Sequence, residues 1–576
     1  MNLAGLTWGL PARWHPDEKA DAAARMAREG TLEPDSFINP SLPLYVEWPV
    51  LLAQARAADA GWLRGRAADP LLAGRILSAL AGAAAVWTLG RAAGRMRRDL
   101  SVLAAALLAL SPGVVNLCHF ATPEPWLLLG TAATLLLALD HLRGRRGVAL
   151  LGITLGLTAA TKYTAAALLV PCLVAVWLRP RTGEDRTRLE ANLVAFAGAA
   201  LVVIAALLAT GPGHALAGSL HLPDARLLRP ESAAGFVQSM AMLLAAAGAA
   251  LVVIGVAARR GAAWAGPLAR ADAIALAAVA AIAFAAATPY AVLRAPAFLS
   301  DLAFNQQTRH EYKGLASAST SFWPYLELLA GALTAPLAVT AVAGTIVAAA
   351  RAGRGERAAA VAFSAAVAPY LLVASSGHQA MRFLAPALPA AALCAALALR
   401  AIPPPPARGP LAGLVLARAA LGTALVLRLF FVDSRYAAAR WLEANVPPSA
   451  TVDLIANSPG YGPARPRGSL RIVPTLSREM APPDRFLAAA SAYRREGAPW
   501  LVLTASYYER FLDHPDQAPE RAAFFRELLE GRGGYEVAAR FRQSGWRRPL
   551  AEFVDPEIVV LKKTDAPAAP AQLPTR

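Results

Sequence analysis

Long runs of apolar residues, separated by short polar loops, dominate the first three quarters of the chain. The runs cover about 70–91, 99–118, 123–140, 147–162, 163–178, 191–211, 234–258, 270–292, 325–350, 358–376, 382–400 and 411–431. A helix needs about 20 apolar residues to cross a bilayer, where lipid offers the backbone no hydrogen-bond partner. The pattern predicts a mainly α-helical, polytopic transmembrane bundle. Residues 1–11 resemble the outer end of a further helix, so we expect about 13 spans, the first of them truncated.

Basic residues mark alternate loops between these runs. Arginines gather after the runs that end near 91, 140, 178, 258, 350 and 400, whereas the intervening loops carry far fewer. Short cytoplasmic loops are enriched in Lys and Arg, so the basic loops are predicted to be cytoplasmic and the others extracytoplasmic. By this alternation residues 13–69 form the first outer loop. Its apolar piece 41–55 holds Glu47 centrally and is expected to be interfacial or partly re-entrant.

The composition changes after residue 431 to a mixture of short apolar stretches and amphipathic ones. Strands are expected in ATVDLIA, LRIVPTL, APWLVLTA and PEIVVLKK, and helices in RYAAARWLEAN, PDRFLAAASAYRRE and RAAFFRELLEG. We therefore predict a transmembrane domain over 1–431, a soluble extracytoplasmic α/β domain over 432–563 and a disordered tail over 564–576.

Composition agrees with a membrane protein and excludes other classes. The chain is 56% hydrophobic and 16% charged, against about 25% charged residues in soluble domains. The net charge of +17 comes largely from arginines between apolar runs, where they orient spans, so no nucleic-acid partner is expected. Cys118, Cys172 and Cys394 all lie in apolar runs and are expected to be buried hydrophobes rather than disulfides or metal ligands.

Ionisable residues cluster in the loops predicted to face outward. The set comprises His15, Asp17 and Glu18; Glu124; Lys162 and Tyr163; Arg309, His310, Glu311 and Lys313; and His378 and Arg382. Carboxylates serve as general bases or hold a divalent cation, and Lys and Arg bind phosphate. A site with both would suit transfer of a sugar from a lipid-linked phosphate to a hydroxyl.

Each of these residues also has a structural interpretation. Asp17 and Glu18 would fit the start of a solvated surface helix, and Glu124 would stabilise a helix N-terminus. Lys162 and Arg382 would fit as interface anchors. The His and Glu positions lack a spacing such as HExxH, so no dedicated zinc site is expected. Metal dependence, with Asp17 and Glu124 as the candidate ligands of a divalent cation, stays open.

Four local patterns, in their order and outward placement, carry a family resemblance. They are LTWGLPARWHPDEKADAAARM, HFATPEPWLLLGTAATLLLAL, GITLGLTAATKYTAAALLVP and RFLAPALPAAALCAAL. The chain resembles the GT-C superfamily of integral membrane glycosyltransferases, especially the aminoarabinose transferases and protein O-mannosyltransferases. The resemblance covers most of the chain and implies a GT-C bundle with an outer domain.

The resemblance also implies roles for individual residues. The donor would be a polyprenyl-phosphate-linked sugar, Asp17 the catalytic base or the carboxylate that positions the acceptor, and Glu18 its neighbour in the site. Glu124 would be the second acid, where such families often have Asp. Lys162, with Tyr163 beside it, and Arg382 would bind the donor phosphate. Transfer would invert the anomeric centre. His15, Arg309, His310, Glu311, Lys313 and His378 are further candidates for substrate binding.

The expected acceptor and cellular location follow from the resemblance and from the composition. The acceptor would be a hydroxyl of a glycolipid, a polysaccharide or a protein, and no cofactor beyond a divalent cation is indicated. A composition rich in Ala, Arg, Gly and Pro indicates a GC-rich bacterial genome, hence the inner membrane with the active site facing the periplasm. Two alternatives stay open. One is a polytopic transporter or lipid-linked glycan flippase, and the other an inactive scaffold that presents the outer domain.

Overall fold

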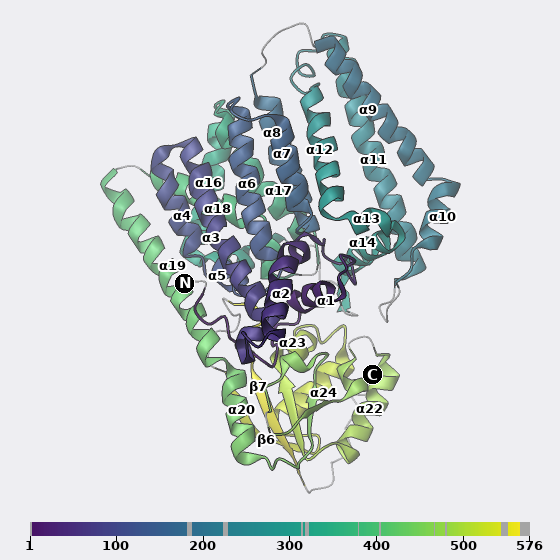
Figure 1. The fold of residues 1–576 in the computed structure, drawn as a ribbon, viewed down its shortest axis with the longest axis vertical. Helices are drawn as coiled ribbons and strands as arrows, with labels where there is room; N and C mark the ends of the chain where they lie inside the picture. Colours follow the sequence, from purple (N-terminus) through teal and green to yellow (C-terminus); the bar gives the residue numbers. More distant parts are fainter. Residues whose placement is uncertain are drawn as a thin grey trace.

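A helical bundle joins a smaller domain built on a β-sheet (Figure 1). The computed structural model describes residues 3–180, 187–222, 228–312, 315–316, 322–377, 379–402, 405–465, 467–478, 481–542 and 551–564. The bundle contains α3 (Pro70–Met96), α4 (Ser101–Ala109), α5 (Pro112–Leu117), α6 (Glu124–Leu142), α7 (Val148–Ala159), α8 (Leu169–Leu178), α9 (Thr187–Leu208), α11 (Pro230–Arg259), α12 (Ala271–Ala287), α15 (Phe322–Leu333), α16 (Ala335–Gly353), α17 (Arg357–Ala374), α18 (Leu388–Ala401) and α19 (Pro405–Val432).

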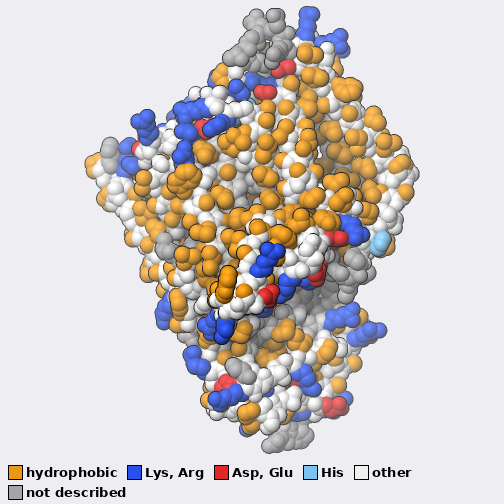
Figure 2. Space-filling view, in the orientation of Figure 1, with side chains coloured by type: hydrophobic (Ala, Val, Ile, Leu, Met, Phe, Trp, Pro, Cys, Tyr) orange, Lys and Arg blue, Asp and Glu red, His pale blue; other side chains and the backbone are white. Residues whose placement is uncertain are grey.

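Long apolar helices make this a multi-pass membrane protein. Within the described residues, 7 helices are long and apolar enough to cross a bilayer. Hydrophobic side chains cover the flank of the bundle, as a lipid-facing surface requires (Figure 2). Small residues allow close helix contact: a Cβ at Gly198 in α9 would lie 2.6 Å from the carbonyl oxygen of Gly248 in α11.

The two ends of the bundle differ in charge. α3, α6 and α11 finish in or next to arginines (Arg95, Arg143 and Arg259) at the end farther from the sheet (Figure 1). Lys and Arg side chains gather on that upper end of the bundle in Figure 2. The first predicted outer loop lies at the opposite end, where its helices α1 (Ala20–Glu29) and α2 (Leu42–Asp59) lie between the bundle and the sheet domain (Figure 1).

The structure corrects several of the expected spans, and 270–292 is one of them, because it is split at Thr288 into α12 and α13 (Pro289–Leu293). Residues 3–12 form successive turns instead of a helix end, because Gly5 and Gly9 have φ of 84° and 66°. The run 99–118 is split into α4 and α5 before Pro112, whose ring lacks the N–H that a continuous helix needs. The run 325–350 is split into α15 and α16 at Thr334, which has a φ of 76°.

Shorter helices cover the end of the bundle that faces the sheet domain. These are α10 (Gly211–Ser219), α13 (Pro289–Leu293) and α14 (Ala295–His310), and α14 leads into the two-residue strands β1 (Glu311–Tyr312) and β2 (Leu315–Ala316). Helix α2 packs on α1 and α3. Its Glu47 is 2% exposed, and burial raises the pKa of that carboxyl to about 8.

The C-terminal domain is a five-stranded sheet in the order β4-β3-β5-β7-β6. Its strands are β3 (Val452–Ile455), β4 (Leu470–Ile472), β5 (Trp500–Thr504), β6 (Tyr535–Phe541) and β7 (Ile558–Lys563), and its helices α20 (Ser434–Asn445), α21 (Pro474–Ser477), α22 (Pro483–Glu496), α23 (Ala505–Asp513) and α24 (Pro519–Leu529). β3 pairs in parallel with β4 and β5, while β7 is antiparallel to β5 and β6. All four predicted strands and all three predicted helices are present, which confirms the α/β class.

A buried ionic cluster attaches the sheet domain to the start of the chain. Asp433, between α19 and α20, accepts hydrogen bonds from Trp8 Nε1 at 3.1 Å and from two guanidinium nitrogens of Arg435 at 2.9 Å. The same guanidinium lies over Trp14, 4.5 Å from its ring centroid, and donates to the carbonyl of Phe553 at 2.7 Å. The first loop, the α19–α20 junction and the loop before β7 are therefore held together.

Candidate functional site

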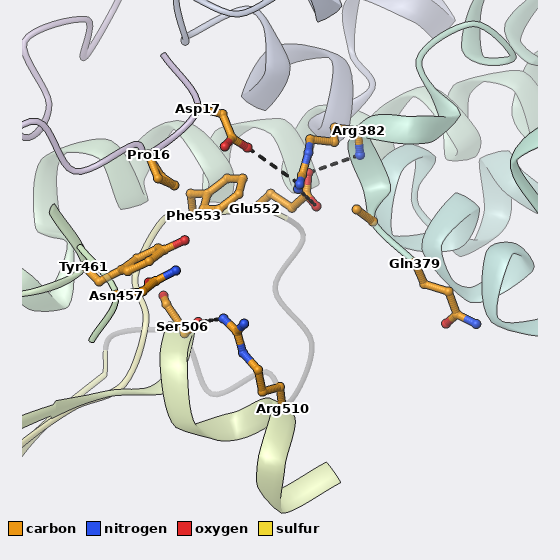
Figure 3. A pocket seen from close by; sticks show the side chains of 11 residues that line it. Pro16, Asp17, Gln379, Arg382, Asn457, Tyr461, Ser506, Arg510, Glu552 and Phe553 are labelled. Atoms are coloured by element: carbon orange, nitrogen blue, oxygen red, sulfur yellow. Dashed lines mark hydrogen bonds and ion pairs between the residues drawn. The ribbon is translucent and has the colours of Figure 1, made fainter. Parts of the chain in front are cut away.

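A cavity of about 380 Å³ lies where the bundle meets the sheet domain (Figure 3). Its lining residues are Pro16, Asp17, Gln379, Ala380, Arg382, Asn457, Tyr461, Ser506, Arg510, Glu552 and Phe553. Asp17 comes from the first loop and Arg382 from the 3₁₀ turn η4 (Met381–Leu384). Both domains thus contribute polar side chains to one cavity, and two residues predicted from the sequence face each other across it.

His15 shapes the turn that carries Asp17. Its ring is buried between Phe120 and Phe553, with centroids 4.2 and 4.3 Å away. Burial lowers the pKa of His15 to about 4, although the charges of Glu18 and Asp17 oppose this. The imidazole is therefore neutral at pH 7, and its Nδ1 accepts the backbone N–H of Asp17 at 3.1 Å. His15 thus orients the residue that follows the turn.

Asp17 is a charged group open to the cavity. Its side chain is 48% exposed, and its Oδ2 lies 3.6 Å from Nη2 of Arg382. Burial acts to raise the pKa of Asp17, but the positive charge of Arg382, with a smaller contribution from Lys19, outweighs it and leaves the pKa below its ordinary value. The carboxylate is ionised at neutral pH and can accept a proton or a hydroxyl hydrogen bond from a ligand.

Glu18 does not line the cavity, and its side chain is enclosed. Both carboxylate oxygens accept hydrogen bonds at 2.7 Å from the guanidinium of Arg75 in α3, and Oε1 also accepts the backbone N–H of Ala121 at 2.9 Å. Arg75 donates in addition to the carbonyls of Leu6 and Trp8, each at 2.7 Å. Burial acts to raise the pKa of Glu18, but the charge and hydrogen bonds of Arg75 hold it below its ordinary value. This pair anchors the first loop to the bundle.

Glu124 and Lys162 form a second pair beside the cavity. Glu124 opens α6 directly after Pro123, and Lys162 stands in extended conformation between α7 and the 3₁₀ helix η3 (Tyr163–Leu168). The two side chains are buried and make a direct ion pair. The Lys162 ammonium also lies 5.3 Å from the ring centroid of Phe383, the neighbour of Arg382. The structure thus brings together Asp17, Glu124, Lys162 and Arg382.

Glu552 is the acidic residue that sequence reasoning missed. It comes from the loop before β7 and binds Arg382 twice: Oε1 accepts from Nη1 at 3.0 Å and Oε2 from the backbone N–H at 3.1 Å (Figure 3). Burial raises the pKa of Glu552, while Arg382 opposes the rise. No motif surrounds Glu552. The only available signal was its place in a domain predicted to share the face of the acidic loops.

Tyr163 and Arg309, which the structure describes, do not line this cavity. The Tyr163 hydroxyl donates to the carbonyl of Phe37 at 2.7 Å. The Arg309 guanidinium donates to the carbonyl of Leu372 at 3.2 Å and to Ser375 Oγ at 2.7 Å, so it ties α14 to the end of α17. Lys313 and His378, and the side chains of His310 and Glu311, fall outside the described residues.

Asp17 and Glu124 are the residues predicted to hold a divalent cation. Across the described ranges, no group of three or more His, Cys, Asp and Glu residues is arranged to hold a metal ion. Glu124 is engaged by Lys162, and Asp17 faces Arg382. A divalent cation at Asp17 and Glu124 stays a prediction.

Residues 67–209 match the family model described as dolichyl-phosphate-mannose-protein mannosyltransferase. The matched segment, about a quarter of the chain, includes both Glu124 and Lys162. The match confirms, for this segment, the resemblance to GT-C glycosyltransferases. No curated protein matches the chain in sequence.

Solved structures of three proteins resemble the chain at low identity. The oligosaccharyltransferase AglB from Archaeoglobus fulgidus, in complex with an inhibitory peptide and a dolichol-phosphate, is 15% identical over 92% of this chain and 70% of its own, with a TM-score of 0.47. ArnT from Cupriavidus metallidurans, bound to undecaprenyl phosphate, is 14% identical over 99% and 98%, with a TM-score of 0.43. The arabinofuranosyltransferase AftD from Mycobacteria is 17% identical over 98% and 39%, with a TM-score of 0.37.

Proposed function

We propose that the protein transfers a sugar from a polyprenyl-phosphate-linked donor to a hydroxyl acceptor. The observation that carries this proposal is the meeting of an exposed carboxylate, Asp17, with the guanidinium of Arg382 in one cavity at the end of the bundle. The ion pair of Glu124 and Lys162 next to it lies in the segment that matches a family named for a lipid-phosphate-linked mannose donor. A base and phosphate-binding cations are the groups that this reaction needs.

In the proposed reaction Asp17 accepts the proton of the acceptor hydroxyl as its oxygen attacks the anomeric carbon. The bond from that carbon to the phosphate oxygen breaks, and the electron pair leaves with the lipid phosphate. Attack from the face opposite the phosphate inverts the anomeric centre. Because Arg382 keeps Asp17 ionised, the base is ready at neutral pH.

Lys162 and Arg382 would bind the leaving phosphate. A phosphate is stable as an anion, so its departure needs neutralising charge rather than a protonating acid. Arg382 offers a planar fork and Lys162 a compact charge, and both border the ring of Phe383. Glu124 then holds Lys162 in place, while Glu18 and Arg75 fix the loop that carries Asp17.

We propose further that the cavity faces the outside of a bacterial inner membrane. The arginine-rich ends of α3, α6 and α11 lie at the other end of the bundle, and such loops are typical of the cytoplasmic side. The acceptor would then reach Asp17 from the periplasm, along the sheet-domain residues Asn457 and Ser506.

The test is an Asp17→Asn variant in a strain that lacks the native gene. We expect transfer to fall by about 10²–10⁴-fold, because a general base contributes that much. Mass spectrometry of envelope glycans and of purified reaction products measures the loss of transfer. The variant should be expressed and inserted into the membrane at the normal level. The matched control is Asp35→Asn, since Asp35 lies in the same loop and forms an exposed ion pair with Arg25. Near-normal transfer by the Asp17 variant would defeat the assignment, and lipid movement without a glycosidic product would support the transporter alternative.

A further inference from the structure

The side chain of Glu552 occupies a place on Arg382 that a phosphate would also use. Its two oxygens accept from the guanidinium at 3.0 Å and from the backbone N–H at 3.1 Å. Phosphate oxygens can accept from both of these donors, Nη1 and the backbone N–H, so a phosphate would compete with the Glu552 carboxylate for them. We propose that the Glu552 carboxylate is an internal substitute for the donor phosphate, an inference that rests on the proposed function. To bind Arg382, the donor phosphate must displace Glu552.

The backbone around Glu552 is held in a way that projects this side chain into the site. The N–H of Glu552 donates to Asn116 Oδ1 at 2.9 Å, and the next carbonyl, that of Phe553, accepts from Arg435 at 2.7 Å. Phe553 and Asp555 have φ of 63° and 56°, in the left-handed region that non-glycine residues rarely adopt. Such strain persists where the surroundings enforce it, and it is common at functional sites.

The charges around Arg382 also favour displacement of Glu552 by the donor phosphate. Next to Arg382, the residues Asp17, Glu124 and Glu552 bring three negative charges, whereas Lys162 and Arg382 itself bring two positive ones; Arg510 lines the sheet-domain side of the cavity. Glu18 adds nothing to this balance because Arg75 neutralises it. An anionic donor that approaches Arg382 therefore meets a local excess of negative charge as long as Glu552 is ionised there. Displacement of Glu552 frees Nη1 and the backbone N–H of Arg382 for the phosphate.

Displacement leaves Glu552 buried without its cation, and a buried unpaired carboxylate takes up a proton. Burial raises the pKa of Glu552 even with Arg382 present. The titratable and charged groups around it are Arg382 from η4, Asp17 from the first loop, Glu124 from α6 and Tyr325 from α15. Donor binding is thus coupled to proton uptake, so affinity falls as pH rises.

The experiment measures binding of undecaprenyl methyl phosphate to the full-length protein in nanodiscs. This phosphodiester keeps one negative charge at every pH used, so any bound proton belongs to the protein. We expect Glu552→Gln to lower the Kd about fivefold to tenfold, as loss of a charged competitor at hydrogen-bond distance should. It should also flatten the pH dependence seen in the wild type. Glu443→Gln is the matched control, because Glu443 pairs with Arg467 on the surface of the same domain.

The outcomes separate the two proposals. Equal or weaker binding by Glu552→Gln, with binding by the wild type, overturns the role of Glu552 and leaves the proposed function standing. No binding by the wild type overturns both. If Glu552→Gln does not fold, calorimetry of the wild type in two buffers of different ionisation enthalpy decides: proton uptake on binding supports the proposal, and its absence overturns it.

Discussion

Two neighbouring carboxylates in the first loop have opposite surroundings. Glu18 is enclosed with Arg75, at side-chain exposures of 1% and 0%, and each of its oxygens has a hydrogen bond at 2.7 Å. Asp17 is 48% exposed and approaches Arg382 at 3.6 Å, in a cavity that both domains line. The first pair is complete without a ligand. The second has an exposed carboxylate and a guanidinium that another anion could reach.

The difference shows how an acidic dipeptide serves two purposes. Adjacent residues in an irregular loop point in different directions, so one can anchor the loop while the other faces the cavity. His15 enforces the division, since its Nδ1 accepts the N–H of Asp17 at 3.1 Å. The Glu18–Arg75 pair should therefore control folding, and the Asp17–Arg382 pair should control chemistry and binding.

The largest effect should come from Arg75→Met. This change leaves Glu18 buried without its cation and removes the bonds to the carbonyls of Leu6 and Trp8. Removing one partner of a buried ion pair lowers the free energy of unfolding by about 3–5 kcal/mol. We expect the folded fraction in detergent to collapse, as measured by thermal unfolding and size-exclusion chromatography. A variant of wild-type stability would contradict the anchoring role of this pair.

A smaller effect is expected from Arg382→Lys, which keeps the charge but loses the planar fork. Donor binding should weaken by about tenfold, equivalent to about 1.4 kcal/mol, with little loss of folded protein. Titration with a polyprenyl phosphate measures it. Arg510→Lys is the control, because Arg510 lines the sheet-domain side of the same cavity. An equal loss of donor binding in Arg510→Lys would indicate that the phosphate binds on the sheet-domain side of the cavity.

Sequence patterns predicted much of the fold because bilayer burial and strand burial leave strong signals. The long apolar runs predicted most of the bundle helices, and short apolar runs predicted β3, β4, β5 and β7. β6 lacks such a run because only Tyr535 is buried, and its other residues alternate between exposed and half-buried positions at the edge of the sheet. The helix breaks at Pro112 and Thr334 were not predicted, because the residues on both sides of each turn are apolar and the hydrophobic pattern continues through it.

The candidate site was only partly accessible from the sequence. Asp17, Glu124, Lys162 and Arg382 could be proposed because ionisable residues near apolar runs are uncommon. Arg75 carried the same signal, since it lies inside the run 70–91, but its partner could not be read from spacing. Glu552 is 170 positions from Arg382, and only the packing of the two domains brings them together.

The most direct test of the central claim is a structure of the protein in nanodiscs with undecaprenyl methyl phosphate bound. The account predicts phosphate density within hydrogen-bond distance of both Lys162 and the guanidinium of Arg382, with Asp17 facing the space beyond the phosphate. Phosphate bound elsewhere, with Arg382 making no contact to it, would contradict the account.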